Sequence, residues 1–314
     1  MIYSLGFDGG GTKTDCVLLD ESGAIAGQGR GGPANPLRAG YDQAFASLQE
    51  AAAQAISAAK IRTTDVTRVC AGLAGAGRKS VIRRVMVFLA QEFPAALTQV
   101  TTDYEIALEA AAGPGAGVVL IAGTGSVAFG RNRAGATARA GGHGPWVGDE
   151  GSAFEIGRRA FSAVARARDG DAPATLLSET IPTALQVPDW DELLLQSAKA
   201  PDEFFPQLFP VVLDTAEKND SVAMEILLNS AARLGRLAAA VIRRLGMSGG
   251  SFALVKCGGV FGHSSFFDSE VDSALRAAAM RATISCLEIS PAVGAARMAA
   301  RLSLAPSESA PHGD

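Results

Sequence analysis

Hydrophobic and polar positions along this chain fall into two alternating patterns. Short apolar runs of strand length are separated by longer segments in which apolar residues recur every three or four positions, as on one face of a helix. Before residue 113 they predict strands at 2–8, 15–20, 24–30, 66–73 and 98–102, and helices at 41–59, 78–92 and 104–112. Strands that alternate with crossover helices in this way are typical of an α/β fold.

The pattern starts again after a glycine-rich segment at 113–117. It predicts strands at 118–122, 126–131, 137–141, 252–257 and 283–287, and helices at 150–168, 269–280 and 291–302. Residues 172–246 are mostly helical in pattern, with interruptions at Pro182, Pro188, Pro201 and Pro206. We expect an N-terminal domain at 1–116, a C-terminal domain at 117–302 whose last helix, 291–302, can pack on the N-terminal domain, and a disordered tail at 303–314.

The composition is that of a folded protein with room for two cores. Of the 314 residues, 48% are hydrophobic and 19% are charged, and the net charge of −4 is spread without a basic block. This argues against a nucleic-acid partner, and no apolar stretch reaches the ~18 residues of a membrane helix. The three histidines and four cysteines lack metal-ligand spacing. We interpret the cysteines as buried free thiols and expect a cytoplasmic protein without a membrane partner. They are Cys16, Cys70, Cys257 and Cys286.

One glycine-rich signature occurs near the start of both halves. The first copy, at 8–15, reads DGGGTKTD, and the second, at 122–126, reads AGTGS; each lies between two apolar runs. Glycines let a backbone approach a ligand and aim successive N–H groups at it, hydroxyl side chains add donors, and Lys13 adds a positive charge. Two such hairpins predict a nucleotide held by its phosphates in a cleft between two related domains.

Two near-matches to other nucleotide motifs are weaker. Residues 72–80 run from a strand to a helix as a P-loop does, but Arg78 stands where the motif requires lysine, which favours a structural loop. Residues 123–128 resemble a dinucleotide fingerprint, yet that motif must open a helix, and Val127 continues a strand instead.

Two further glycine-containing motifs occur in the second half of the chain. The glycine pair Gly258-Gly259 follows a later strand, and the string Gly-Asp-Glu-Gly at 148–151 precedes a long helix. Together with the hairpins they resemble the sugar kinase/Hsp70/actin superfamily, and within it the N-acetylglucosamine kinase-like branch of the BadF/BadG/BcrA/BcrD ATPase family, over residues 2–302. The resemblance implies an α/β fold of two ribonuclease-H-like (actin-like ATPase) domains that flank a nucleotide cleft.

The resemblance also implies an activity. It indicates an ATP- and Mg²⁺-dependent kinase for an amino sugar, most directly N-acetylglucosamine, which becomes its 6-phosphate. Glucosamine, N-acetylmuramic acid and N-acetylmannosamine stay open as acceptors, and relatives commonly form homodimers. An ATPase switch without a sugar substrate and a nucleotide-binding protein without catalysis remain alternatives. The iron–sulfur and zinc cysteine motifs of other branches are absent from the sequence.

Asp103 is the expected catalytic base. It follows a strand and opens a helix, so its position alone favours a helix cap; by resemblance it accepts the proton of the attacking sugar hydroxyl. Asp8 would hold Mg²⁺. The residues expected to bind the nucleotide are Asp8, Gly10, Gly11, Thr12, Lys13, Gly123, Thr124, Gly125, Gly258 and Gly259. The residues expected to bind the sugar are Asn35, Asp103, Ser126, Gly142, His143, Gly144 and Asp149.

Two positions depart from the family pattern. His143 stands where N-acetylglucosamine kinases often carry tryptophan, and Trp146 follows three residues later. Val127 stands where mammalian-type enzymes carry asparagine. Both lie in the expected sugar pocket and not at the phosphate site. The sequence therefore predicts ATP-dependent phosphorylation more firmly than it predicts which sugar is phosphorylated.

Overall fold

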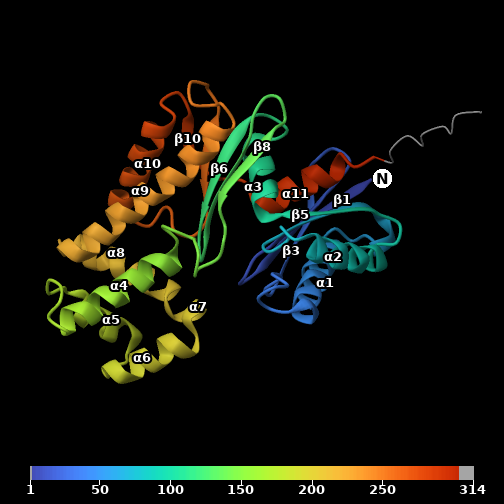
Figure 1. The fold of residues 1–314 in the computed structure, drawn as a ribbon. Coiled ribbons are helices and arrows are strands. Elements are labelled where there is room, and N and C mark those ends of the chain that lie inside the picture. Colours follow the sequence, from blue (N-terminus) through green and yellow to red (C-terminus); the bar gives the residue numbers. More distant parts are fainter. Residues whose placement is uncertain (1, 304–314) are drawn as a thin grey trace, which may run out of the picture. The chain divides into compact units, whose positions relative to one another are not determined.

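A computed structural model describes residues 2–303 of the chain (Figure 1). Contacts between residues divide this part of the chain into two compact units, one of residues 2–114 with 288–303, and one of Gly115–Leu287. Each unit holds one five-stranded sheet and its own helices, which confirms the α/β class. Of the tail expected at 303–314, residues 304–314 lie outside the described part.

The sheet of the first unit joins three antiparallel strands to two parallel ones. Its order is β3-β2-β1-β4-β5. β1 pairs with β2 in antiparallel and with β4 in parallel orientation, so β1 is the central strand. The strands are β1 (Tyr3–Gly9), β2 (Thr14–Leu19), β3 (Ile25–Gly31), β4 (Val66–Leu73) and β5 (Leu97–Thr102).

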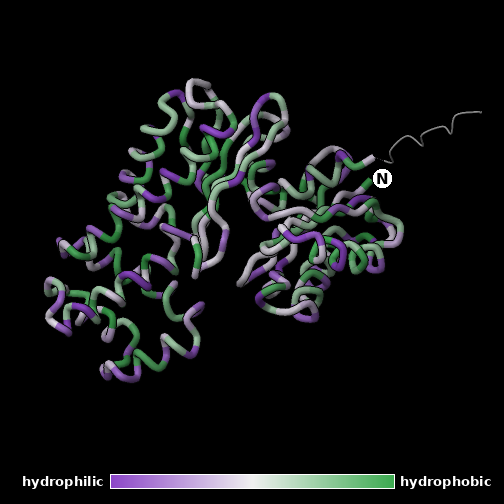
Figure 2. The backbone as a smooth tube through the Cα atoms, viewed as in Figure 1, coloured by the Kyte–Doolittle hydropathy of each residue, from purple (hydrophilic) through white to green (hydrophobic). Residues whose placement is uncertain are grey.

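Helices cover both faces of this sheet. Along them hydrophobic and hydrophilic residues alternate, as expected for helices that bury one side (Figure 2). They are α1 (Tyr41–Ala58), the short 3₁₀ turn η1 (Thr63–Asp65), α2 (Lys79–Glu92), α3 (Asp103–Ala112) and α11 (Pro291–Ala300).

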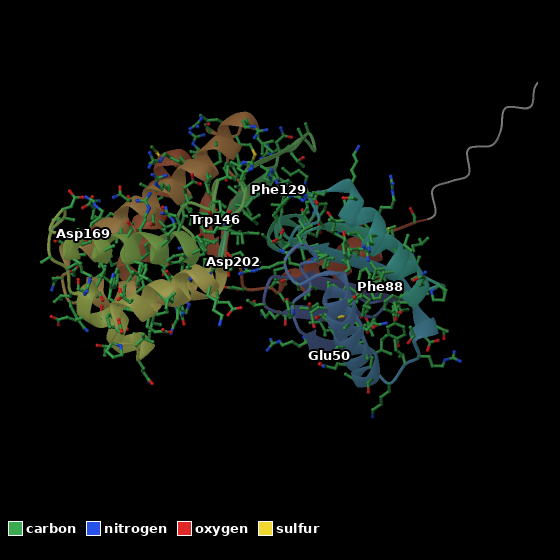
Figure 3. The ribbon with its side chains drawn as sticks, turned by 60° about the horizontal axis from the view of Figure 1, so that its bottom comes forward. Glu50, Phe88, Phe129, Trp146, Asp169 and Asp202 are labelled. Atoms are coloured by element: carbon green, nitrogen blue, oxygen red, sulfur yellow. The ribbon has the colours of Figure 1, made fainter. Side chains whose placement is uncertain are left out.

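Successive side chains of β1 enter two different helical layers, because strand residues alternate between faces. Leu5 and Phe7 are fully buried in the core shared with α1 and α2. In that core Phe88 of α2, labelled in Figure 3, stacks on Phe45 of α1 with ring centroids 4.1 Å apart. The residue between them, Gly6, faces α11 instead.

α11 comes from the end of the chain but packs on the first unit. A Cβ on Gly6 would lie 2.1 Å from the backbone nitrogen of Ala296. A Cβ on Gly294 would lie 2.2 Å from the carbonyl oxygen of Ile106 in α3. Any side chain at either glycine would clash with backbone, so these two residues let α11 approach β1 and α3 this closely.

The sheet of the second unit repeats the topology of the first. Its order is β10-β9-β6-β7-β8, with β6, β7 and β8 antiparallel and β9 and β10 parallel to β6. β6 therefore corresponds to β1, and the repeat seen in the sequence is also a repeat in structure. The strands are β6 (Gly117–Ala122), β7 (Ser126–Arg131), β8 (Thr137–Gly141), β9 (Ala253–Cys257) and β10 (Thr283–Cys286).

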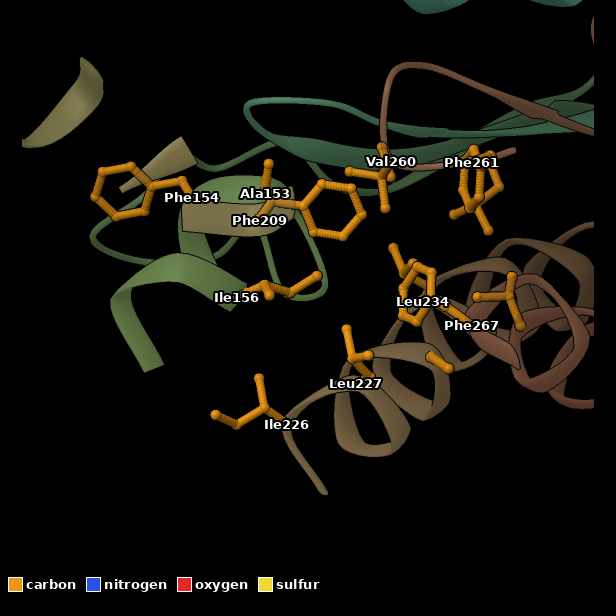
Figure 4. Packing of buried hydrophobic residues seen from close by; sticks show 14 of the residues in the cluster. Ala153, Phe154, Ile156, Phe209, Ile226, Leu227, Leu234, Val260, Phe261 and Phe267 are labelled. Carbon is orange, nitrogen blue, oxygen red and sulfur yellow. The ribbon is translucent and has the colours of Figure 1, made fainter. Parts of the chain in front are cut away.

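The second unit differs from the first by a large helical insertion between β8 and β9. Its core gathers aromatic and aliphatic side chains from several helices, among them Phe154, Phe209, Leu227 and Phe267 (Figure 4). The elements are α4 (Ala153–Arg168), α5 (Leu177–Leu185), α6 (Trp190–Lys199), α7 (Pro201–Phe204), η2 (Pro206–Leu208), α8 (Phe209–Glu217), α9 (Ser221–Arg244) and, after β9, α10 (Ser265–Ala278).

Two expectations need correction. Pro182 lies inside α5 and does not interrupt it; Leu177 and Ile181 are fully buried, so packing holds the helix although proline removes one backbone hydrogen bond. The cysteines are not all buried, because Cys257 is half-buried and Cys286 is exposed. No helix within residues 2–303 is both long and apolar enough to cross a membrane.

Candidate active site

The first glycine hairpin joins β1 to β2 and is closed by a backbone hydrogen bond from Gly10 N to the Lys13 carbonyl oxygen, 2.9 Å. Asp8, the second-last residue of β1, pairs across the strands with Asp15. The hairpin also receives the loop that follows β3, since the backbone N–H groups of Ala34 and Asn35 both donate to the Gly10 carbonyl oxygen at 3.0 Å. The turn is therefore fixed from two sides.

Asp8 lies in surroundings that disfavour its charged form. Burial raises the pKa of its carboxyl to about 7, with help from the negative charges of Asp103 and Asp15 and against the positive charge of Lys13. A half-buried carboxyl group beside further carboxylates suits a hard, oxygen-ligated cation such as Mg²⁺, which would restore its charge balance. Asp8 is thus the residue of this hairpin that could hold the metal.

Lys13 is turned to a neighbouring carboxylate. Its Nζ lies 2.6 Å from Oδ2 of Asp15, whose other oxygen accepts a 2.9 Å hydrogen bond from Arg30. Burial alone would raise the pKa of Asp15, but the hydrogen bonds from Lys13 and Arg30 hold it below its usual value. In this structure the expected phosphate-binding lysine is therefore paired within its own hairpin.

Asp103 is the first residue of α3 but does not cap it. The cap is Thr102, and Glu105 reaches back to accept hydrogen bonds from the Thr102 N–H at 3.1 Å and hydroxyl at 2.7 Å. The Asp103 carboxylate accepts a 3.0 Å bond from the Tyr104 N–H. Burial raises the pKa of Asp103. The capping role that its position allowed is filled by other residues.

Asn35 helps to shape the loop beside the hairpin. Its Oδ1 accepts a hydrogen bond from the Leu37 N–H at 3.1 Å, so the residue does serve as a turn residue. Gly75, within the P-loop-like segment, lies against it: a Cβ there would be 2.8 Å from the same oxygen. That segment thus packs against the loop that carries Asn35.

One charged side chain beside the first hairpin, Arg38, was not singled out from the sequence. A Cβ built on Gly11 would lie 3.4 Å from Nη1 of Arg38. The arginine stands in an irregular loop with no spacing that marks it, so only the folded backbone reveals that it lies on the hairpin.

The second glycine hairpin joins β6 to β7 and lies beside the glycine pair. Its turn is closed by Gly123 N and the Gly125 carbonyl oxygen at 2.9 Å. Gly258 has a φ of 110°, and a Cβ there would lie 2.3 Å from the Ala122 carbonyl oxygen. The backbone nitrogen of Gly259 is 4.0 Å from the place of a Cβ on Gly123. The two glycine motifs of the second unit thus form one surface of backbone.

Asp149 contacts this second hairpin. It adopts a left-handed φ of 60° and is 7% exposed. Burial raises the pKa of its carboxyl, whereas hydrogen bonds from the N–H groups of Ser126 and Gly144 oppose the rise. A Cβ on Gly125 would lie 2.7 Å from Oδ2 of Asp149, so only glycine fits there without displacing the carboxylate.

The other residues of the second unit that are expected to bind the sugar differ in burial and contacts. Ser126 is buried, and its hydroxyl donates to the Glu150 carbonyl oxygen at 2.8 Å, which ties β7 to the acidic string. Gly142 and His143 are exposed in the loop before Asp149. In the same loop Trp146, labelled in Figure 3, is 71% exposed and lies edge-on to Phe154.

Each unit thus contains some of the residues that are expected to bind the nucleotide and the sugar. The first unit brings together Asp8, the glycine hairpin, Asn35 and Asp103. The second brings together its hairpin, Asp149 and Gly258-Gly259, with Gly142, His143 and Gly144 in the adjoining loop.

Two curated proteins are similar to this chain over most of its length. N-acetyl-D-glucosamine kinase of Dictyostelium discoideum is 31% identical over 268 residues, which cover 81% of this chain and 84% of that protein. N-acetylmuramic acid/N-acetylglucosamine kinase of Clostridium acetobutylicum is 29% identical over 275 residues, 86% of this chain and 89% of that protein.

A solved structure shares the fold. It belongs to a Chromobacterium violaceum protein assigned as an N-acetylglucosamine kinase, with a TM-score of 0.74 and 24% identity over 95% of this chain and 99% of that chain. Residues 5–299 match the model of the BadF/BadG/BcrA/BcrD ATPase family. The resemblance inferred from the hairpins is confirmed, and the chain belongs to the BadF/BadG/BcrA/BcrD ATPase family.

Proposed function

We propose that this protein is an ATP-dependent amino-sugar kinase that phosphorylates N-acetylglucosamine on O6. The sugar kinases among its relatives support the reaction class. The observation that carries the mechanism is the setting of Asp103. Its helix is capped by Thr102 and Glu105, and its carboxylate is close enough to Asp8 to raise that residue's pKa. A half-buried carboxylate at a helix start that other residues cap, beside a residue that could bind a cation, is what a base for hydroxyl activation requires.

In the proposed reaction Asp103 accepts the proton of the sugar hydroxyl. The hydroxyl oxygen forms a bond to the γ-phosphorus, and the bond from that phosphorus to the β–γ bridging oxygen breaks, so ADP leaves with the electron pair. Asp8 would hold Mg²⁺, which would supply positive charge to neutralise the phosphates. The N–H groups of both hairpins donate to phosphate oxygens.

Substrate positioning falls to the other expected residues. Asn35 and Asp149 would bind sugar hydroxyls, with Gly142, His143 and Gly144 lining the same part of the sugar site. Ser126 would contribute by holding the Glu150 carbonyl and its own N–H in place beside Asp149. Gly258 and Gly259 would receive the adenosine. From the resemblance to its family we further propose that the protein is cytoplasmic and forms a homodimer. Light scattering of the purified protein would test the dimer.

The test is ADP release by the purified protein with Mg·ATP across a panel of hexoses and amino sugars. We expect a rate that rises with N-acetylglucosamine, whereas a greater rise with glucosamine, N-acetylmuramic acid or N-acetylmannosamine would correct the acceptor. Asp103→Asn should lower kcat about 10²–10⁴-fold, since it removes the base at constant size. Asp42→Asn, an equal charge change in the first turn of α1, should leave kcat unchanged.

Two results would contradict the proposal. Full activity in Asp103→Asn would remove Asp103 from the mechanism. ADP release that no sugar accelerates would instead indicate an ATPase switch.

A further inference from the structure

The loop between β3 and α1 is fixed on the first hairpin through a single acceptor. The Gly10 carbonyl oxygen receives the N–H groups of Ala34 and Asn35, both at 3.0 Å. Three residues later the Arg38 N–H donates to the Asn35 carbonyl oxygen at 3.1 Å, and the Ala39 N–H donates to the same oxygen at 2.9 Å. The backbone that carries Arg38 is therefore held by the hairpin and by its own turn.

The side chain of Arg38 continues from this turn along the glycine edge of the hairpin. A Cβ on Gly11 would lie 3.4 Å from Nη1 and 3.6 Å from Cδ of Arg38. The guanidinium group thus occupies the space beside Gly11, at the turn whose backbone is expected to bind phosphate. Arginine presents its N–H groups as a planar fork that matches phosphate oxygens.

The negative charges expected around the hairpin favour a cation there. Asp8 and Asp103 contribute two carboxyl groups, and a transferring phosphoryl group adds negative charge on its three outer oxygens. Lys13, the cation expected from the sequence, lies 2.6 Å from Asp15. Arg38 is a second cation of this unit, and its side chain lies beside Gly11 of the hairpin.

We propose that Arg38 binds the terminal phosphoryl group of the nucleotide at the glycine edge of the first hairpin and stabilises the charge on its oxygens during transfer. This rests on the proposed kinase function and adds a catalytic residue to it. Fixed cations that meet charge developing in the transition state are among the strongest contributions an active site makes.

The experiment compares Arg38→Gln and Arg38→Lys with wild type and with Arg62→Gln. Arg62 has an 82% exposed side chain paired with Asp65, so its replacement removes the same charge from the same unit. Arg38→Gln should lower kcat about 10²-fold and weaken binding of a non-hydrolysable ATP analogue, while ADP affinity stays within about twofold. Arg38→Lys should recover part of kcat, and all variants should melt at the wild-type temperature.

Several outcomes would overturn the proposal. One is a wild-type kcat in Arg38→Gln; another is an equal loss of affinity for ADP and for the analogue, together with a lower melting temperature. A loss confined to N-acetylmuramic acid would also overturn it, because Arg38 would then bind the carboxylate of that acceptor. If wild type shows no sugar-dependent ADP release, the proposed function fails, yet the comparison of ADP with the analogue still decides whether Arg38 contacts the terminal phosphate.

Discussion

At the scale of single residues, Asp8 combines a proposed function with a cost to stability. Its pKa is raised from 3.8 to about 7 in the folded protein. Folding is therefore favoured when Asp8 is protonated: this contribution is complete below about pH 4 and is lost as the pH rises through about 7. At pH 8, without a cation, the folded protein carries an anion that its surroundings oppose.

Asp8→Asn should consequently raise the melting temperature in metal- and nucleotide-free buffer at pH 8. The expected gain is about 2–4 kcal/mol, from a pKa shift of about three units, and it should shrink as the pH falls to 5. Differential scanning fluorimetry in EDTA at both pH values measures it, with Asp42→Asn as the control. Equal melting of Asp8→Asn and wild type at pH 8 would contradict the electrostatic account of this site.

At the scale of elements, a buried ion network supports the glycine pair of the second unit. Lys256 on β9 is 4% exposed; its Nζ lies 2.7 Å from Asp272 and 3.4 Å from Asp268, both on α10. Burial would lower the pKa of Lys256, but the two aspartates raise it, so the lysine is charged. Asp268 also accepts the Gly262 N–H at 2.9 Å. The network therefore joins β9, α10 and the loop that begins with Gly258-Gly259.

Lys256→Met should destabilise the protein by about 2–4 kcal/mol, because two half-buried carboxylates lose their cation. The KM for ATP should rise more than the KM for the sugar, since the loop proposed to hold the adenosine loses an anchor. Urea unfolding and steady-state kinetics measure the two effects, with Lys199→Met, in the last turn of α6, as the control. A uniform fall in kcat with an unchanged KM for ATP would argue against this role.

The sequence predicted helices and strands better than it predicted the contacts of individual side chains. The strand at 66–73 was predicted to the residue because β4 is rich in buried apolar residues, from Val69 to Leu73 in particular. Pro182 was misread because burial of Leu177 and Ile181 is a tertiary effect. The Ser126 hydroxyl proved to bind the Glu150 carbonyl, and Arg38 proved to lie on Gly11; both contacts join segments that only the folded chain brings together.

At the scale of the whole molecule, the first unit is built from both ends of the chain. α11 packs on β1 and α3 through Gly6 and Gly294, and beyond it Arg301 pairs with the buried carboxylate of Glu109 at 2.8 Å. Without these residues the sheet face around Val17 and Leu19 would lose its apolar cover. The sequence predicted that this helix can pack on the N-terminal domain, and the contacts at Gly6 and Gly294 agree with this, although an apolar helix stripe by itself does not say which sheet it covers.

A fragment of residues 1–114 should therefore be unstable alone, whereas the same fragment joined by a flexible linker to residues 288–303 should unfold cooperatively. The fragment 115–287 should fold by itself, because its core holds no residue from outside it. Circular dichroism during thermal unfolding tests all three. Cooperative unfolding of 1–114 at the temperature of the linked form would show that α11 is dispensable.

This arrangement sets an order for biosynthesis. Domains generally fold as they leave the ribosome, the N-terminal one first. Here the N-terminal sheet emerges first but obtains its last helix only after the whole of the second unit has been made. The second unit can complete its folding while the first still has an open apolar face around Val17 and Leu19, so the first-made domain is the last to be finished.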